Sequence, residues 1–191
     1  MHLPILACLT ALAVSATAMS ATDSLQDDWW AAMNALCGKA FAGELRYAPP
    51  GDTTFEGKAL VMHVKSCDPE RLRIPFVVGD DRSRTWVLTR ADSRIMLKHD
   101  HRHADGSSDE ITMYGGTTPN PGSARAQIFP ADDETVAVLP NGYPNVWMMS
   151  IDPGVSFTYF VQRLNTERAF HVVFDLTREV EAPQAPWGWE D

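Results

Sequence analysis

The sequence predicts an all-β protein, arranged as an antiparallel up-and-down barrel of about ten strands with one N-terminal helix. Apolar and polar residues alternate along short runs such as 72–78 and 170–176, as expected for strands with one buried face. Clusters of Pro, Gly, Asp and Asn separate the runs, so each strand should pair with its neighbours in sequence. This nearest-neighbour pairing favours a barrel over the alternative, a β-sandwich.

One helix is predicted before the strands, over residues 24–37. Ser24 is a suitable N-cap, acidic residues in the first turn suit the helix dipole, and Gly38 follows the last turn. An apolar stripe at helical spacing should pack on the barrel or plug one of its ends. The stripe consists of Leu25, Trp29, Ala32, Met33 and Leu36.

The strands should follow in order, each ended by a turn sequence such as Asp152-Pro153-Gly154. A short helix at 132–139 interrupts them after the seventh strand and would cap or cover one end of the barrel. The predicted strand ranges are 39–48, 55–66, 70–78, 84–90, 94–103, 109–116, 123–129, 145–151, 155–164 and 168–177.

The two ends of the chain differ from this single barrel domain, which spans residues 22–178. Residues 1–21 are apolar and small, which is typical of an export signal, with cleavage near residues 18–21. That run is short for a membrane span and no later stretch qualifies, so we expect a soluble protein, secreted or periplasmic. The Pro-rich tail at 179–191 contains two tryptophans, and we expect it to fold back on the barrel.

Charge and cysteine content narrow the partners and the compartment. The net charge of -9 argues against nucleic acid and against an anionic membrane surface as the main partner. Of the three cysteines, Cys8 lies in the predicted signal, which leaves Cys37 and Cys67. Two cysteines in an exported chain are expected to form a disulfide, worth roughly 3 kcal/mol for a loop of about 30 residues.

The candidate site is the stretch from His99 to Asp109, which holds three of the six histidines. His99, His101 and His103 occupy alternate positions of a predicted strand and therefore share one face. A five-residue loop over 104–108 would group the apolar residues on that face and turn it toward the barrel interior. The pairs in this register are His103 with Asp109, His101 with Ile111 and His99 with Met113.

Three interpretations of this stretch stay open. As a metal site for Zn²⁺ or another divalent transition metal such as Cu²⁺ or Fe²⁺, it would use His99, His101, His103 and Asp109. As a ligand site, the imidazoles would orient a polar head group above an apolar lumen, and an arginine near the mouth could meet a carboxylate. The residues predicted for that role are His99, His101, His103, Tyr114, Tyr159 and Arg163. As structure, the histidines would be hydrogen-bonded wall residues.

Enzyme signatures are scarce, which favours a binding protein while leaving catalysis open. The sequence has no G-x-S-x-G, H-E-x-x-H or dinucleotide-binding motif. We therefore predict a protein that binds a small molecule or metal ion at the histidine-rich hairpin. The alternatives are a metal-dependent hydrolase that activates water through His99 and His101, and a structural or interaction module of the cell envelope without a pocket.

Several segments together resemble a family of exported bacterial proteins of unassigned function. The resemblance covers most of the predicted mature chain and implies no activity, cofactor or ligand. The segments are Ile74-Pro75-Phe76, 79–89 (GDDRSRTWVLT), 97–103 (LKHDHRH) with Asp105-Gly106, and 112–116 (TMYGG).

A looser similarity is to the calycin superfamily of lipocalins, fatty-acid-binding proteins and nitrobindin-like haem proteins. Ten strands after a short N-terminal helix resemble that arrangement. The first-strand motif of those families, which contains glycine and tryptophan, is missing, and 38–43 (GKAFAG) stands in its place. The ligand class therefore stays open, because fold analogy alone does not establish function.

Overall fold

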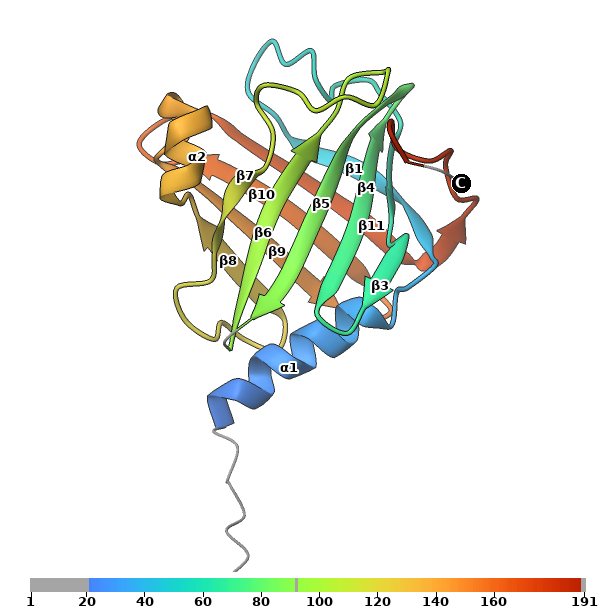
Figure 1. The fold of residues 1–191 in the computed structure, drawn as a ribbon. Coiled ribbons are helices and arrows are strands. Elements are labelled where there is room, and N and C mark those ends of the chain that lie inside the picture. Colours follow the sequence, from blue (N-terminus) through green and yellow to red (C-terminus); the bar gives the residue numbers. More distant parts are fainter. Residues whose placement is uncertain (1–20, 92, 190–191) are drawn as a thin grey trace, which may run out of the picture.

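A single antiparallel sheet curls into a nearly closed barrel, which confirms the predicted barrel and excludes the sandwich (Figure 1). The computed structural model describes residues 21–91 and 93–189, with side chains from Leu25 onward. The predicted export signal lies outside the described residues. Within the described part of the chain, no helix has the length and apolarity that crossing a membrane requires.

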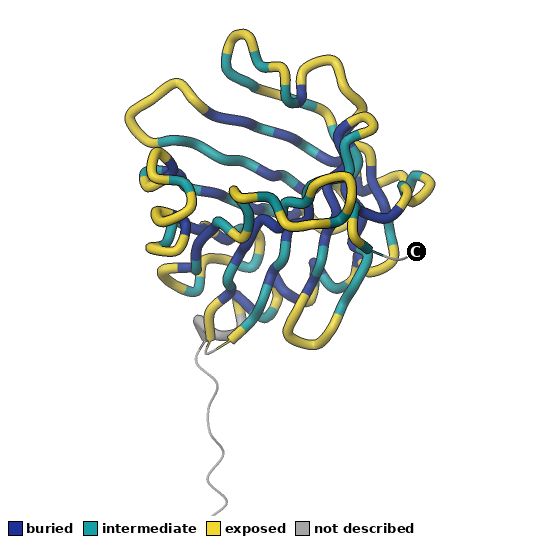
Figure 2. Tube along the Cα trace, turned by 45° about the horizontal axis from the view of Figure 1, so that its top comes forward, coloured by how far each residue is buried: buried dark blue, intermediate teal, exposed yellow. Residues whose placement is uncertain are grey.

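The strands follow the order β7-β6-β5-β4-β2-β1-β11-β10-β9-β8, with β3 paired only to β4. Buried and less buried residues alternate along them, and the connecting loops are exposed (Figure 2). Their bounds are β1 (Ala40–Tyr47), β2 (Leu60–His63), β3 (Ser66–Asp68), β4 (Arg71–Val78), β5 (Asp81–Ala91), β6 (Arg94–His101), β7 (Tyr114–Thr117), β8 (Ala126–Pro130), β9 (Asn145–Asp152), β10 (Ser156–Arg163) and β11 (Ala169–Val180).

The predicted strand at 55–66 is wrong over residues 55–59, which form no strand. The rest of the predicted range is divided between β2 and the start of β3. The cause is Asp52, whose carboxylate accepts backbone N–H bonds from Thr54 (3.0 Å), Phe55 (2.8 Å) and Glu56 (3.1 Å). This local capping supplies the bonds that a strand would otherwise make, so the segment before β2 stays a loop. It brings Phe55 over one mouth of the barrel.

The N-terminal helix α1 (Ala21–Asn34) lies across the other end of the barrel (Figure 1). The helix starts before Ser24, the predicted N-cap. Its buried face differs from the predicted apolar stripe, as shown by Leu25, which belongs to that stripe but is 39% exposed. Gln26 is buried instead and reaches Gln127 Oε1 at 3.3 Å and Thr118 Oγ1 at 3.4 Å. The buried side chains of α1 and the turn after it are Gln26, Trp29, Trp30, Met33 and Leu36.

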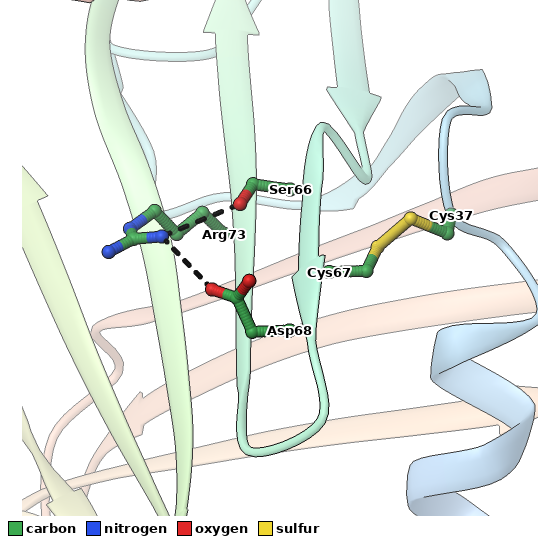
Figure 3. The surroundings of a disulfide bond; sticks show 5 residues. All are labelled: Cys37, Ser66, Cys67, Asp68 and Arg73. Atoms are coloured by element: carbon green, nitrogen blue, oxygen red, sulfur yellow. Dashed lines mark hydrogen bonds and ion pairs between the residues drawn. A yellow bond between two sulfur atoms is a disulfide. The ribbon is translucent and has the colours of Figure 1, made fainter.

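The Cys37–Cys67 disulfide is present, as predicted, and joins the turn after α1 to β3 (Figure 3). Beside it, Arg73 of β4 contacts Ser66 and Asp68, so the short β3 is held on both sides. The covalent bond and these contacts fix the plugging helix to the wall of the barrel.

The seam between β7 and β8 is closed by α2 (Asp133–Val138), within the predicted 132–139 helix. The Thr135 hydroxyl accepts the N–H of Gly115 at 2.6 Å and lies 2.7 Å from its carbonyl oxygen. A Cβ on Gly116 would lie 1.7 Å from the carbonyl oxygen of Pro130, so only glycine fits there. A 3₁₀ turn, η1 (Pro140–Gly142), follows α2, and Leu139 between them reaches the cavity described below.

Aromatic side chains fill the middle of the barrel. Trp86 stacks between Phe76, with ring centroids 4.7 Å apart, and Tyr159, at 4.5 Å. All three are at most 6% exposed. The barrel therefore has no through-channel here, and any ligand space is confined to an end.

The tail after β11 folds back on the barrel, as expected. Arg82 donates to the carbonyl oxygen of Ala185 at 2.7 Å, and the N–H of Trp187 donates to the carbonyl of Arg82 at 3.2 Å. The guanidinium of Arg73 lies 5.6 Å from the ring centroid of Trp189. The tail thus covers part of the outer face of β4 and β5.

Candidate functional site

A cavity of about 260 Å³ opens at the end of the barrel opposite α1. Its walls come from the strand ends that meet at this mouth and from the loops between them. The lining residues are Thr54, Phe55, Arg84, His101, Ile111, Tyr114, Leu139, Asn145, Trp147, Tyr159, Val161, Arg163, Arg168 and Phe170.

Strand pairing arranges this lining in levels. At the rim, Arg163 pairs with Asn145 in the ladder of β10 and β9. One level deeper, Val161 pairs with Trp147 on one side and Phe170 on the other. Deeper still is Tyr159, stacked on the core residue Trp86. Polar groups therefore lie at the rim of this wall, and apolar surface lies below them.

The cavity lining carries three arginines and, among its described residues, no acid, although the whole chain has 25 acidic and 16 basic side chains. Arg84 is neutralised by an ion pair with Asp81. Arg163 donates from Nε to Asn145 Oδ1 at 3.1 Å, and the Arg168 guanidinium lies 5.2 Å from the ring centroid of Phe170. The ion pairs found among the described residues include neither Arg163 nor Arg168.

These two rim arginines are close enough to repel one another. Burial first, and then the charge of Arg168, lowers the pKa of Arg163 below its usual value. An arginine remains protonated at neutral pH even so. The rim is thus a place of uncompensated positive charge, which favours a bound anion.

His99 lies just below the cavity and is fully hydrogen-bonded. Its Nδ1 is 3.0 Å from the backbone carbonyl oxygen of Tyr114, and its Nε2 is 2.9 Å from the Tyr159 hydroxyl. A carbonyl only accepts, so Nδ1 carries the proton and Nε2 accepts from Tyr159. Burial, followed by the charges of His101 and Lys98, lowers the pKa of His99 to about 3, so the ring is neutral near pH 7.

His101 lines the cavity and pairs with Tyr114, whose hydroxyl oxygen lies 3.0 Å from His101 Nε2. Burial and the charge of Arg84 lower the pKa of His101 to about 4, and burial raises the pKa of Tyr114 to about 12. Both groups are therefore neutral near pH 7. The Tyr114 ring also stacks on His99 at 4.7 Å, which gives this wall a flat, polarisable face.

The predicted register of the histidine hairpin is wrong by one residue. His99 pairs with Tyr114 and not with Met113, and β7 starts only at Tyr114. The N–H of Asp109 donates to the carbonyl of His101, and the N–H of Met113, which has a left-handed φ of 54°, donates to the carbonyl of His99, so residues 110–112 bulge out between these two bonds. The extra chain length between the strands shifts the pairing.

The four predicted metal ligands lie in two separate places. His99 and His101 lie in the barrel wall, whereas His103 is in the exposed loop beyond β6. There His103, Asp109 and Glu110 form a group whose ligand atoms all lie within 4.8 Å of one another. Glu110 was not predicted. This group is a possible metal-binding site of one histidine and two carboxylates.

Of the six predicted ligand contacts, the structure brings four to the cavity lining. These are His101, Tyr114, Tyr159 and Arg163. His99 supports Tyr159 from below, and His103 lies outside. The chain matches no protein-family model, and neither curated proteins nor solved structures give a significant match. The family resemblance noted in the sequence stays a prediction, and function must be argued from this geometry.

Sequence reasoning missed the other polar residues of the cavity. Arg84 lies two residues before Trp86 on β5, and Arg168 lies two residues before Phe170 of β11. Because side chains two apart on a strand share a face, this spacing placed both arginines on the same inward face as the aromatic residue. Asn145 was missed because it begins its strand, where no pattern precedes it. The signal for the two arginines was present, but it could not show that both line the same cavity.

Proposed function

We propose that this protein binds a small organic anion, such as a carboxylate, in the cavity at the open end of its barrel. The observation that carries the proposal is the charge of the lining: three arginines, two of them without an ion-pair partner among the described residues, and no acid. A guanidinium offers paired N–H donors that match the two oxygens of a carboxylate.

The wall histidines add no charge to the cavity, so the arginines determine the sign of its charge. His99 and His101 have their pKa values lowered to about 3 and about 4, so neither adds charge near pH 7. Both ring nitrogens of His99 already have hydrogen-bond partners, which leaves no lone pair for a metal ion. We propose that these residues shape the wall beneath the bound ligand.

The proposed location is outside the cytoplasm, as a secreted or periplasmic protein. The Cys37–Cys67 disulfide supports this, because such bonds persist mainly in oxidising compartments. The resemblance to exported bacterial proteins points the same way. In this setting the partner would be a small molecule taken up from the surroundings.

Calorimetric titration with paired carboxylates and amides tests the proposal. The panel is hexanoate, cyclohexylacetate and phenylacetate, each compared with its neutral primary amide. We expect at least one carboxylate to bind about tenfold or more tightly than its amide, as for a charge-assisted contact. Arg163→Gln together with Arg168→Gln should remove that preference.

The matched control is Arg46→Gln, because Arg46 is exposed and paired with Glu44 at 2.8 Å on another part of the barrel. It should leave binding unchanged. If no carboxylate exceeds its amide, or if the control variant weakens binding as much as the double variant, the anion proposal is wrong. A chain that binds none of the panel would favour the envelope-module alternative.

A second candidate is divalent-metal binding by His103, Asp109 and Glu110, supported by the 4.8 Å separation of their ligand atoms. One imidazole and two carboxylates suit Zn²⁺ or a related ion. Titration with Zn²⁺ should give one binding event that is lost in His103→Asn and in Glu110→Gln. His171→Asn, on β11, is the control. Unchanged Zn²⁺ binding in the two loop variants would refute this site, and Zn²⁺-dependent ester hydrolysis would support the hydrolase alternative.

A further inference from the structure

We infer that the ligand is a single-ring aromatic carboxylate, held with its ring inside the cavity and its carboxylate at the rim. This inference rests on the proposed anion binding and goes further by naming the class of ligand and its orientation. It follows from the size of the cavity, the chemistry of its wall and the position of its charges.

Size limits the ligand to about one ring. A cavity of roughly 150 Å³ in a protein core holds one benzene molecule. The cavity here, of about 260 Å³, therefore has room for one six-membered ring with a short side chain. Below it, the stacked rings of Trp86 and Tyr159 close the barrel, with centroids 4.5 Å apart. A long acyl chain or a haem would find no space in this interior.

Five of the fourteen residues that line the cavity are Phe, Tyr or Trp. Two ring pairs stand on different parts of it: Phe55 and Phe170, edge to face at 5.0 Å, and Tyr114 and Trp147, tilted at 6.0 Å. Tyr159 completes the set below them. Offset-stacked and edge-to-face contacts between aromatic rings are favourable beyond the effect of burial alone. Such a wall favours an aromatic ligand over a saturated one of the same shape.

The charges fix the direction in which the ligand enters. Arg163 and Arg168 lie at the rim, one at the last residue of β10 and the other just before β11. The deep hydroxyl of Tyr159 already donates to His99, so the floor offers little to a charged group. A carboxylate is therefore stabilised at the rim. A second charge at the far side of the ring would meet no unpaired cation among the described lining residues, because the third arginine, Arg84, is already paired with Asp81.

The rim of the cavity also offers a neutral hydrogen-bond donor besides the arginines. The amide of Asn145 is held by Arg163 through its oxygen, at 3.1 Å, which leaves its NH₂ group as a donor. Asn145 is a lining residue. A carboxylate between Arg163 and Arg168 thus has a third, neutral donor near it.

The test compares phenylacetate with cyclohexylacetate, which has the same charge and a similar shape but no π-system. Calorimetry on the full chain should give about 3- to 10-fold tighter binding of phenylacetate. Phe55→Leu keeps an apolar side chain at this position and should lower the ratio without removing the preference for carboxylate over amide. Phe160→Leu, on the outer side of β10 against His171, is the matched control and should leave the ratio unchanged.

Orientation is tested with 4-carboxyphenylacetate, which carries a second carboxylate at the far side of the ring. It should bind at least about tenfold more weakly than phenylacetate. The inference is overturned if cyclohexylacetate binds as tightly as phenylacetate, if Phe55→Leu leaves the ratio intact, or if the dicarboxylate binds equally well. In each of those outcomes the carboxylate-over-amide preference still reports separately on the proposed anion binding, which fails only if that preference is missing.

Discussion

The two ends of the barrel differ in how far their polar and charged side chains are paired. At the α1 end, Trp29 and Met33 are fully buried, and the polar side chain of Gln26 is bonded inside. At the other end an open cavity carries Arg163 and Arg168 with no carboxylate partner among the described residues. The first arrangement lowers the free energy of the folded state, and the second leaves charge unsatisfied. Under the proposed function, stability therefore resides mainly at one end and recognition at the other.

The largest expected effect is at the plugged end. Trp29→Ala should reduce the free energy of unfolding by about 4 kcal/mol, since it removes a fully buried aromatic side chain and leaves a cavity. Urea denaturation measures the change. Among the described residues the indole nitrogen of Trp29 has no hydrogen-bond partner, so Trp29→Phe should cost much less, about 1.5 kcal/mol or below. A large loss of phenylacetate affinity in folded Trp29→Phe would contradict the division between the ends.

Loss of the disulfide should have the next largest effect. Cys37→Ser with Cys67→Ser opens a loop closed over a sequence separation of 30, and the chain-entropy model gives about 3–4 kcal/mol for it. Thermal melting of the double variant, compared with the oxidised wild type, measures the loss. Because the bond lies at the α1 end, carboxylate binding by the remaining folded protein should be unchanged. An unchanged melting temperature would show that packing alone holds the helix.

Acid should destabilise the barrel through His99, which lies between the two ends. The pKa of this ring falls from an ordinary value near 6.5 to about 3 on folding, so the unfolded chain binds the proton more readily. The stabilisation is complete above pH 6.5 and is lost as the pH falls toward 3. Between pH 6.5 and 4.5 the stabilisation should decline by about 2–3 kcal/mol. Urea titrations at several pH values should show a shallower decline for His99→Gln, and an identical slope would refute this assignment.

The local alternation of strands was enough to predict the barrel and much of the cavity. Tyr159 and Arg163 point into it because side chains two apart share a face, a rule that needs no long-range information. His99 also faces inward for this reason. The prediction of the helix, by contrast, missed the burial of Gln26, because its partners Gln127 and Thr118 are about a hundred residues away.

The sequence-based predictions were wrong where a side chain bonds locally to the backbone, or where the chain leaves the hydrogen-bonded ladder between two strands. Asp52 holds three N–H groups and so replaces the expected strand with a loop. Met113 takes a left-handed conformation, which is uncommon for a residue with a Cβ, and thereby shifts the register of the hairpin. Neither event leaves a periodic signal. Arg163 and Arg168, by contrast, are neighbours across the short β10–β11 hairpin, where the N–H of Arg163 donates to the carbonyl of Arg168 at 2.8 Å, so their proximity is a local feature.

A smaller effect is expected at the seam, midway between the ends. Lys98 is almost fully buried on the outer side of β6 and pairs with Asp132 at 2.7 Å and Glu134 at 2.6 Å. Burial alone would lower the pKa of Lys98, but the hydrogen bonds that its ammonium donates to these two carboxylates overcome that effect and raise it. Lys98→Met should cost about 1–2 kcal/mol, since Asp132 and Glu134 remain partly solvated. Thermal melting measures it, with Lys39→Met, in an exposed pair with Glu179, as the near-neutral control.

The smallest change in stability is expected at the open end, where the functional effect should be greatest. Arg163→Gln with Arg168→Gln removes two like charges that repel one another, at the cost of the bond from Arg163 to Asn145. These terms oppose each other, so the free energy of unfolding should change by less than about 0.5 kcal/mol. Urea denaturation and carboxylate titration on the same samples measure both properties. If the double variant unfolds as easily as Trp29→Ala, the arginines are structural, and the proposed separation of stability from recognition is wrong.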